Sequence, residues 1–123
     1  MGCILRMAEM SLLHAFTIVQ TIGFITEIPS QVQVLIMEHA LKHMTPKTDF
    51  IVYKPEPCQT HLEDEGRTLI TSMEGLNKKV YAKLDDYGNP EEWDEIYDKE
   101  TAQDLKKSGI ARFVITFMLP NEY

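Results

Sequence analysis

One long uncharged stretch constrains this chain most. Residues 10–26 contain no Asp, Glu, Lys or Arg and form the longest uncharged run of the chain. A helix that crosses a bilayer needs about 20 apolar residues, and this shorter stretch also contains His14 and Gln20. It also lacks the basic start and small-residue cleavage site of a signal peptide. We therefore expect no membrane segment here.

The second half of this stretch is rich in β-branched residues, which lose side-chain freedom in helices and suit strands. Alternate residues from Phe16 to Ile28 place aromatic and aliphatic side chains on one face, with the period of a strand. Helical spacing of apolar residues from Leu5 to Ile22 is the competing interpretation. We predict a strand over residues 15–28, preceded by an N-terminal arm or short helix over residues 1–14.

The remaining patterns predict six further elements. Ser30 and Gln33 form a capping-box pattern at the start of the next helix. Asn89 and Pro90 begin a second helix, and whether it breaks near Asp98 stays open. The expected elements are a helix over 31–44, strands over 49–54, 67–73 and 79–84, a helix over 90–107 and a strand over 110–119. A polar loop over 58–66 joins two of the strands.

This order, β-α-β-β-β-α-β, predicts one α+β domain over residues 15–123. We expect a mostly antiparallel sheet with both helices on one face, in a ferredoxin-like split βαβ arrangement with one added strand. The strands over 67–73 and 79–84 are expected to form a hairpin. The long first and last strands are expected to lie in the middle of the sheet.

Charge and cysteine content limit the classes of function. The net charge of −7 opposes direct binding to nucleic-acid backbones, which requires a basic face. Two cysteines, Cys3 and Cys58, make no disulfide framework, and they favour a reduced cytoplasmic protein with free thiols. One bridge between them is the alternative.

Two groups of residues are candidate sites. His39 and His43 lie four apart on a predicted helix, and Cys58 and His61 lie three apart in the following loop, so the four could hold zinc. Solvated side chains are the simpler interpretation. The second group combines aromatic rings with carboxylates, a composition suited to a basic protein partner. Its members are Asp85, Asp86, Tyr87, Glu91, Glu92, Trp93, Asp94, Glu95 and Tyr97.

We find no catalytic motif, and we expect no cofactor other than a possible zinc ion. The helix over 31–44 is apolar over more than one stripe, which is typical of a helix shared with a partner subunit. We therefore expect a small acidic, non-enzymatic protein that binds a macromolecule or self-associates as a homodimer. The alternative is a small enzyme with a pocket between sheet and helices, assisted by a metal at the His/Cys group.

Overall fold

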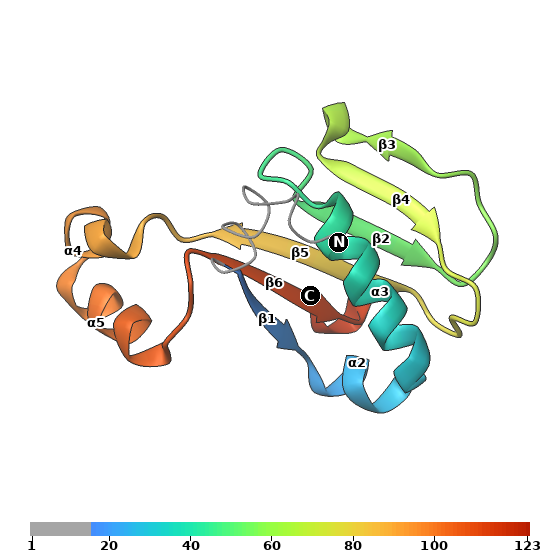
Figure 1. Ribbon diagram of the computed structural model, residues 1–123, viewed down its shortest axis with the longest axis horizontal. Coiled ribbons are helices and arrows are strands. Elements are labelled where there is room, and N and C mark those ends of the chain that lie inside the picture. Colours follow the sequence, from blue (N-terminus) through green and yellow to red (C-terminus); the bar gives the residue numbers. More distant parts are fainter. Residues whose placement is uncertain (1–15) are drawn as a thin grey trace, which may run out of the picture. The chain divides into compact units, whose positions relative to one another are not determined.

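A computed structural model describes residues 16–123 (Figure 1). The expected arm or helix over residues 1–14 and the thiol of Cys3 lie outside these residues. The strands are β1 (Phe16–Gln20), β2 (Phe50–Lys54), β3 (His61–Glu63), β4 (Thr68–Ser72), β5 (Val80–Asp86) and β6 (Phe113–Met118). The helices are α2 (Ile22–Glu27), α3 (Ser30–His43), α4 (Trp93–Ile96) and α5 (Lys99–Ser108). Short 3-10 turns are η1 (Asp64–Gly66), η2 (Pro90–Glu92) and η3 (Pro120–Glu122).

The described residues group into two compact units. One contains residues 16–17 and Asp85–Val114, and the other contains Ile18–Leu84 and Ile115–Tyr123. The single domain expected over residues 15–123 stays a prediction. In the described part of the chain, no helix is long and apolar enough to cross a membrane.

The six strands form one mixed sheet in the order β1-β6-β5-β2-β4-β3. The α+β class is confirmed, but the mostly antiparallel sheet is wrong, because β2 pairs parallel with β4 and antiparallel with β5. The expected β4–β5 hairpin is wrong for the same reason, since β2 lies between them. The Met73 amide donates to the Lys54 carbonyl, and Leu76 is buried, so the connection passes the end of β2 before β5 begins.

The ferredoxin-like order is not confirmed. The first strand was expected in the middle of the sheet, whereas β1 lies at one edge, with β6 between it and β5. The first strand is also much shorter than the predicted 15–28. It ends at Gln20, because the Thr21 hydroxyl accepts a hydrogen bond from the Phe24 amide and starts α2. Phe24 then stacks on Phe117 of β6, with 5.6 Å between the ring centroids.

The core of the larger unit lies between α2, α3 and one face of the sheet. Phe24, Ile36 and Ala40 from these helices are fully buried, as is Tyr53 of β2. The Tyr53 hydroxyl donates to the Ile36 carbonyl and fixes α3 above β2. The expected capping box is wrong, because Pro29 occupies the cap position and makes no side-chain hydrogen bond there.

Two further segments differ from expectation. The polar loop over 58–66 contains β3, which pairs antiparallel with β4, followed by a turn in which Asp64 and Glu65 adopt positive φ. The helix expected over 90–107, whose break near Asp98 the sequence left open, is divided there into α4 and α5, because Asp98 leaves the helical conformation and its carboxylate accepts from the Thr101 amide, capping α5. Pattern matching missed β3 because it has only three residues, all exposed.

Candidate functional site

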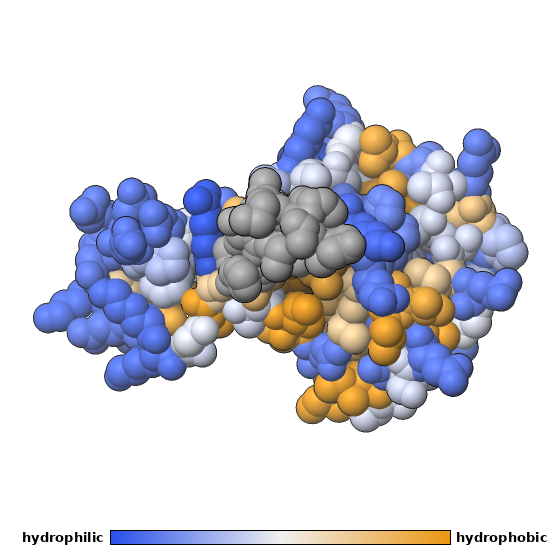
Figure 2. All heavy atoms as spheres, in the orientation of Figure 1, coloured by the Kyte–Doolittle hydropathy of each residue, from blue (hydrophilic) through white to orange (hydrophobic). Residues whose placement is uncertain are grey.

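Exposed apolar side chains gather on β1, α2 and α3 of the larger unit. Ile22 is 78% exposed, and its neighbours on these elements are each exposed by more than a third. Figure 2 shows hydrophobic residues over the region that Figure 1 labels α2 and α3. We name this set the apolar surface, and its members are Ile18, Ile22, Ile25, Val34 and Leu35. A group of large exposed apolar side chains is typical of interaction sites.

The carboxylate of Glu122 anchors the start of α2. It accepts from the Thr21 hydroxyl at 2.5 Å, from the Gly23 amide at 2.8 Å and from the Leu119 amide at 2.9 Å. These hydrogen bonds, that of Thr21 first, hold the pKa of Glu122 below its usual range. A β-carbon at Gly23 would lie 2.7 Å from the carboxylate oxygens, so the close approach requires glycine.

The end of α2 is anchored by α3. The Gln33 side-chain amide lies within hydrogen-bond distance of the Phe24, Ile25 and Ile28 carbonyls, at 2.7–3.3 Å. A helix of six residues has many unpaired carbonyls, and Gln33 satisfies several at once. Both ends of α2 are therefore fixed, and Ile22 and Ile25 are exposed on a helix that is anchored at each end.

One stripe of α3 turns toward β1. The Gln20 side-chain amide contacts the Met37 sulfur at 2.9 Å. Val34 and Leu41 lie three before and four after Met37, on the same stripe of the helix. The broad apolar coverage seen in the sequence therefore divides into a buried stripe and a partly exposed one. The sequence analysis did not identify the residues of α2 as part of the apolar surface, because it predicted a strand there. The available signal for a helix was Thr21 as an N-cap residue, followed by Phe24 and Ile28 at a spacing of four residues.

Two of the predicted metal ligands, His39 and His43, lie together. Their rings stack with 4.0 Å between the centroids. Nδ1 of His39 is 2.9 Å from the Tyr53 hydroxyl, and Nδ1 of His43 is 2.8 Å from the His39 carbonyl. Burial, then the neighbouring His43 and Lys42, lowers the pKa of His39. Burial raises the pKa of the Tyr53 hydroxyl. This arrangement fixes α3 to β2.

The other two predicted ligands lie on a different element. His61 of β3 contacts the Gln59 carbonyl at 2.9 Å and the Glu63 carboxylate at 3.0 Å, and these contacts raise its pKa. Cys58 is half-buried, its thiol is free, and its amide donates to the Ser72 hydroxyl. Across residues 16–123, no three His, Cys, Asp or Glu side chains come close enough together to hold a metal ion. The zinc site predicted from His39, His43, Cys58 and His61 is not assembled in this part of the chain.

The aromatic rings of the acidic segment, residues 85–100, pack inward. Trp93 is 2% exposed, and its indole N–H lies 3.0 Å from the Tyr87 carbonyl and 3.1 Å from that of Gly88. The Tyr97 hydroxyl donates to the same Tyr87 carbonyl at 2.9 Å. The Trp93 and Tyr97 side chains therefore hold α4 against the preceding loop, and Trp93 offers little contact area to a partner.

Several acids of this segment have structural partners within their own unit. Asp86 holds Arg112 through two bonds of 2.8 and 3.1 Å, which lower the pKa of that carboxyl. Asp94 pairs with Lys106 at 2.6 Å. The half-buried Asp85 precedes Asp86 at the end of β5. Besides Asp94, the exposed carboxylates on the turn and on α4 are those of Glu91, Glu92 and Glu95.

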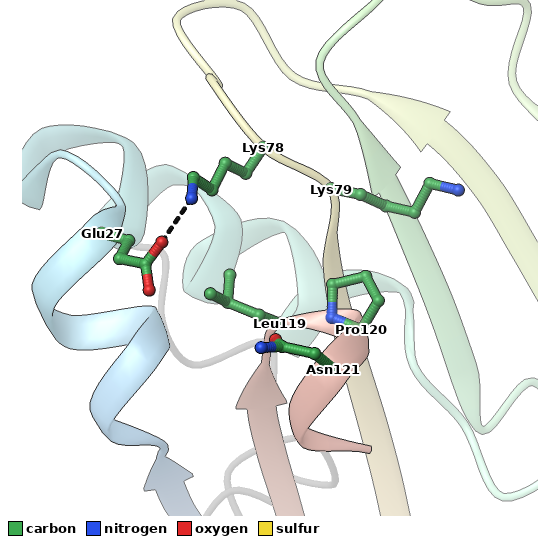
Figure 3. Close-up of a pocket in the computed structure, with 6 residues that line it drawn as sticks. All are labelled: Glu27, Lys78, Lys79, Leu119, Pro120 and Asn121. Atoms are coloured by element: carbon green, nitrogen blue, oxygen red, sulfur yellow. Dashed lines mark hydrogen bonds and ion pairs between the residues drawn. The ribbon is translucent and has the colours of Figure 1, made fainter.

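A hollow of about 300 Å³ lies beside the start of η3 in the larger unit (Figure 3). Lys78 extends to the Glu27 carboxylate and forms an ion pair, whereas Lys79 points away from it. In the described chain its lining contains no His or Cys, so none of the four predicted metal ligands reaches it. The residues that line it are Glu27, Lys78, Lys79, Leu119, Pro120 and Asn121.

Comparison of the chain with models of known protein families, with curated proteins and with solved structures finds no match.

Proposed function

We propose that this protein is a non-enzymatic binding module that self-associates as a homodimer through the apolar surface. One observation carries the proposal: Ile22 and Ile25 stay exposed on a helix whose two ends are fixed by Glu122 and Gln33. Because these isoleucines are held in contact with water, association with a partner that covers them is favourable.

Charge favours a second copy as the partner. The chain carries −7, so two copies repel one another over most of their surfaces. Over residues 16–36 the only charged residue is Glu27, and Lys78 pairs with it. The apolar surface is therefore a region where two copies can meet without bringing like charges together.

Light scattering after gel filtration tests this proposal. We expect a concentration-dependent dimer for the unmodified chain and a monomer for Ile25→Glu, because a buried interface must then desolvate a carboxylate. Leu62→Glu is the matched control, since Leu62 is also exposed, at 57%, but lies on β3. A monomer at high micromolar concentration for the unmodified chain would contradict the proposal.

A second candidate function is capture of a basic protein by the acidic segment. The exposed carboxylates of Glu91, Glu92 and Glu95 support it, because such charges steer encounter with a positive partner. A lysine-rich peptide is the probe. We expect weak, salt-sensitive binding that is lost when the three are replaced by Gln and kept when Glu63, Asp64 and Glu65 are replaced by Asn or Gln. Equal losses in both variants would leave only a general charge effect.

A cytoplasmic location is part of the same proposal. The free thiol of Cys58 supports it, since thiols persist in reducing compartments. Fractionation of cells that express the tagged chain, with alkylation of the thiols before lysis, would test both points. A tagged chain in the membrane or secreted fraction would contradict it.

A further inference from the structure

Within residues 16–123, no strand pairs with the outer edge of β1. Among the described strands, β1 ends the sheet on one side and only β6 lies beside it. The Thr21 amide donates to the Phe117 carbonyl of β6. Backbone groups alternate along a strand, so the Val19 amide also faces β6, and the amides of Ile18 and Gln20 face outward. These outward groups form a template for another strand.

Nothing in the sequence of β1 protects this edge. Proteins usually block open edges with Lys, Pro, bulges or very short strands. β1 has five residues, FTIVQ, without charge or proline. Ile18 and Val19 are 43% and 38% exposed, so both faces of the strand carry apolar area at the edge. This combination is typical of strands that pair with a further strand.

We propose that β1 pairs antiparallel with β1 of a second copy, which joins two sheets into one continuous sheet. The inference rests on the proposed self-association and specifies its geometry. A two-fold axis perpendicular to the sheet relates the copies, so each supplies the same edge and the interface is closed. Both β1 strands are uncharged, so this pairing brings no like charges together.

The pairing also explains where the apolar surface lies. The Gln20 side chain reaches Met37 of α3, so the even-numbered side chains of β1 lie on the helix face of the sheet. Ile18 is therefore on the same side as the exposed residues of α2 and α3. A two-fold axis perpendicular to the sheet places the same face of both copies on the same side. The apolar surfaces of both copies therefore lie on one side of the joined sheet and can be covered together.

Amide hydrogen exchange, read residue by residue by NMR on the full chain, tests the geometry. We expect exchange at Ile18 and Gln20 to slow by at least about tenfold as the concentration rises from monomer to dimer, because these amides gain hydrogen bonds. Amides of β3 should not change. A dimer whose Ile18 and Gln20 amides stay fast would overturn strand pairing while leaving self-association intact. Slow exchange at every concentration would also overturn it, because the chain itself would then cover the edge.

Two substitutions separate strand pairing from apolar contact. Ile18→Pro removes the outward amide and leaves the β6 side of the strand unaltered. A symmetric interface loses this bond twice, so we expect the dissociation constant to rise at least about tenfold. Ile18→Lys keeps the amide but places two like charges near the axis, and we expect a monomer. Leu62→Lys on β3 is its matched control.

The outcomes distinguish the two levels of the proposal. If Ile18→Pro and Ile18→Lys dimerise like the unmodified chain while Ile25→Glu is a monomer, self-association holds and strand pairing is wrong. If the unmodified chain is a monomer, the proposed function fails, and the strand pairing fails with it. Circular dichroism of each variant should match that of the unmodified chain, and Ile18→Lys serves as the test if Ile18→Pro does not fold.

Discussion

The two edges of the sheet are built in opposite ways. β3 has three residues, HLE, and is followed directly by Asp64 and Glu65. β1 has five residues and no charge. Short, charged strands resist pairing with other chains, whereas longer, uncharged strands invite it. The comparison shows that charge is unevenly distributed between the two edge strands of the described chain, since β3 carries charged residues and β1 carries none.

The turn after β3 adds to its protection. Asp64 and Glu65 both adopt positive φ, a conformation that ends the extended strand abruptly. Any approaching strand would meet these two acids together with Glu63. At the other edge, β1 continues into α2, whose exposed isoleucines extend the apolar region beyond the strand. The difference between the edges therefore includes the segments that follow them.

Removing the charges of β3 should produce the largest effect. With His61→Val and Glu63→Val together, β3 loses the charged side chains within the strand, and pairs joined through β1 can join again through β3. We expect growth beyond a dimer to open-ended assemblies, visible as scattering mass that rises with time and concentration. Adding Ile18→Lys should limit the assemblies to pairs. A variant that keeps the mass of the unmodified chain would show that His61 and Glu63 are not what protects β3.

The two sides of β1 should differ in their importance for stability. Val19→Pro removes an amide that faces β6, whereas Ile18→Pro removes one that faces outward. We expect Val19→Pro to lower the free energy of unfolding by about 2 kcal/mol more than Ile18→Pro, because a ladder bond inside the sheet is lost. Urea denaturation at low protein concentration measures both. Equal losses would contradict the assignment of inward and outward amides.

The contrast between the edges also explains what the sequence could and could not predict. Strands β2, β4 and β6 have alternating or continuous apolar residues, and their positions were predicted within a few residues. The order of these strands in the sheet was not predicted. β2 lies between β4 and β5, and the connection that contains the buried Leu76 passes the end of β2 to make this possible. Alternation along a strand gives its faces and carries no information on its neighbours.

The site was harder to predict than the fold class. Residues 15–28 alternate well enough for a strand, yet α2 forms because Thr21 and Glu122 together satisfy its first amides. Glu122 lies far along the chain, so no local pattern could reveal this support. The exposed isoleucines of α2 therefore became visible only with the tertiary contact. The aromatic rings of the acidic segment were recognised, but Trp93 proved to be buried.

The anchor that holds α2 beside the open edge can be tested by a double-mutant cycle. Alanine in place of a helical glycine normally stabilises a protein by about 0.5–1 kcal/mol. Gly23→Ala should instead destabilise this chain, because the new β-carbon displaces the Glu122 carboxylate and its hydrogen bonds. In a Glu122→Ala background the same substitution should stabilise. Thermal unfolding of the four variants gives the sign, and two effects of equal sign would contradict the anchor.

The smallest expected effect concerns the ion pair on the protected edge. The Gln59 carbonyl and then Glu63 raise the pKa of His61, so protonated His61 favours the folded state. Its contribution is complete below the ordinary histidine pKa and is lost as the pH rises through the raised value. NMR titration should show the midpoint of His61 above the usual range and that of His39, lowered by burial, below it.

Glu63→Gln separates the two causes at His61. We expect the midpoint of His61 to fall but to stay above the ordinary value, because the Gln59 carbonyl still accepts from the ring. The midpoint of His39 should not move, which makes it an internal control in the same spectrum. An unchanged His61 midpoint would show that the His61–Glu63 pair does not form in solution. The protection of β3 would then depend on its short length and on the neighbouring acids.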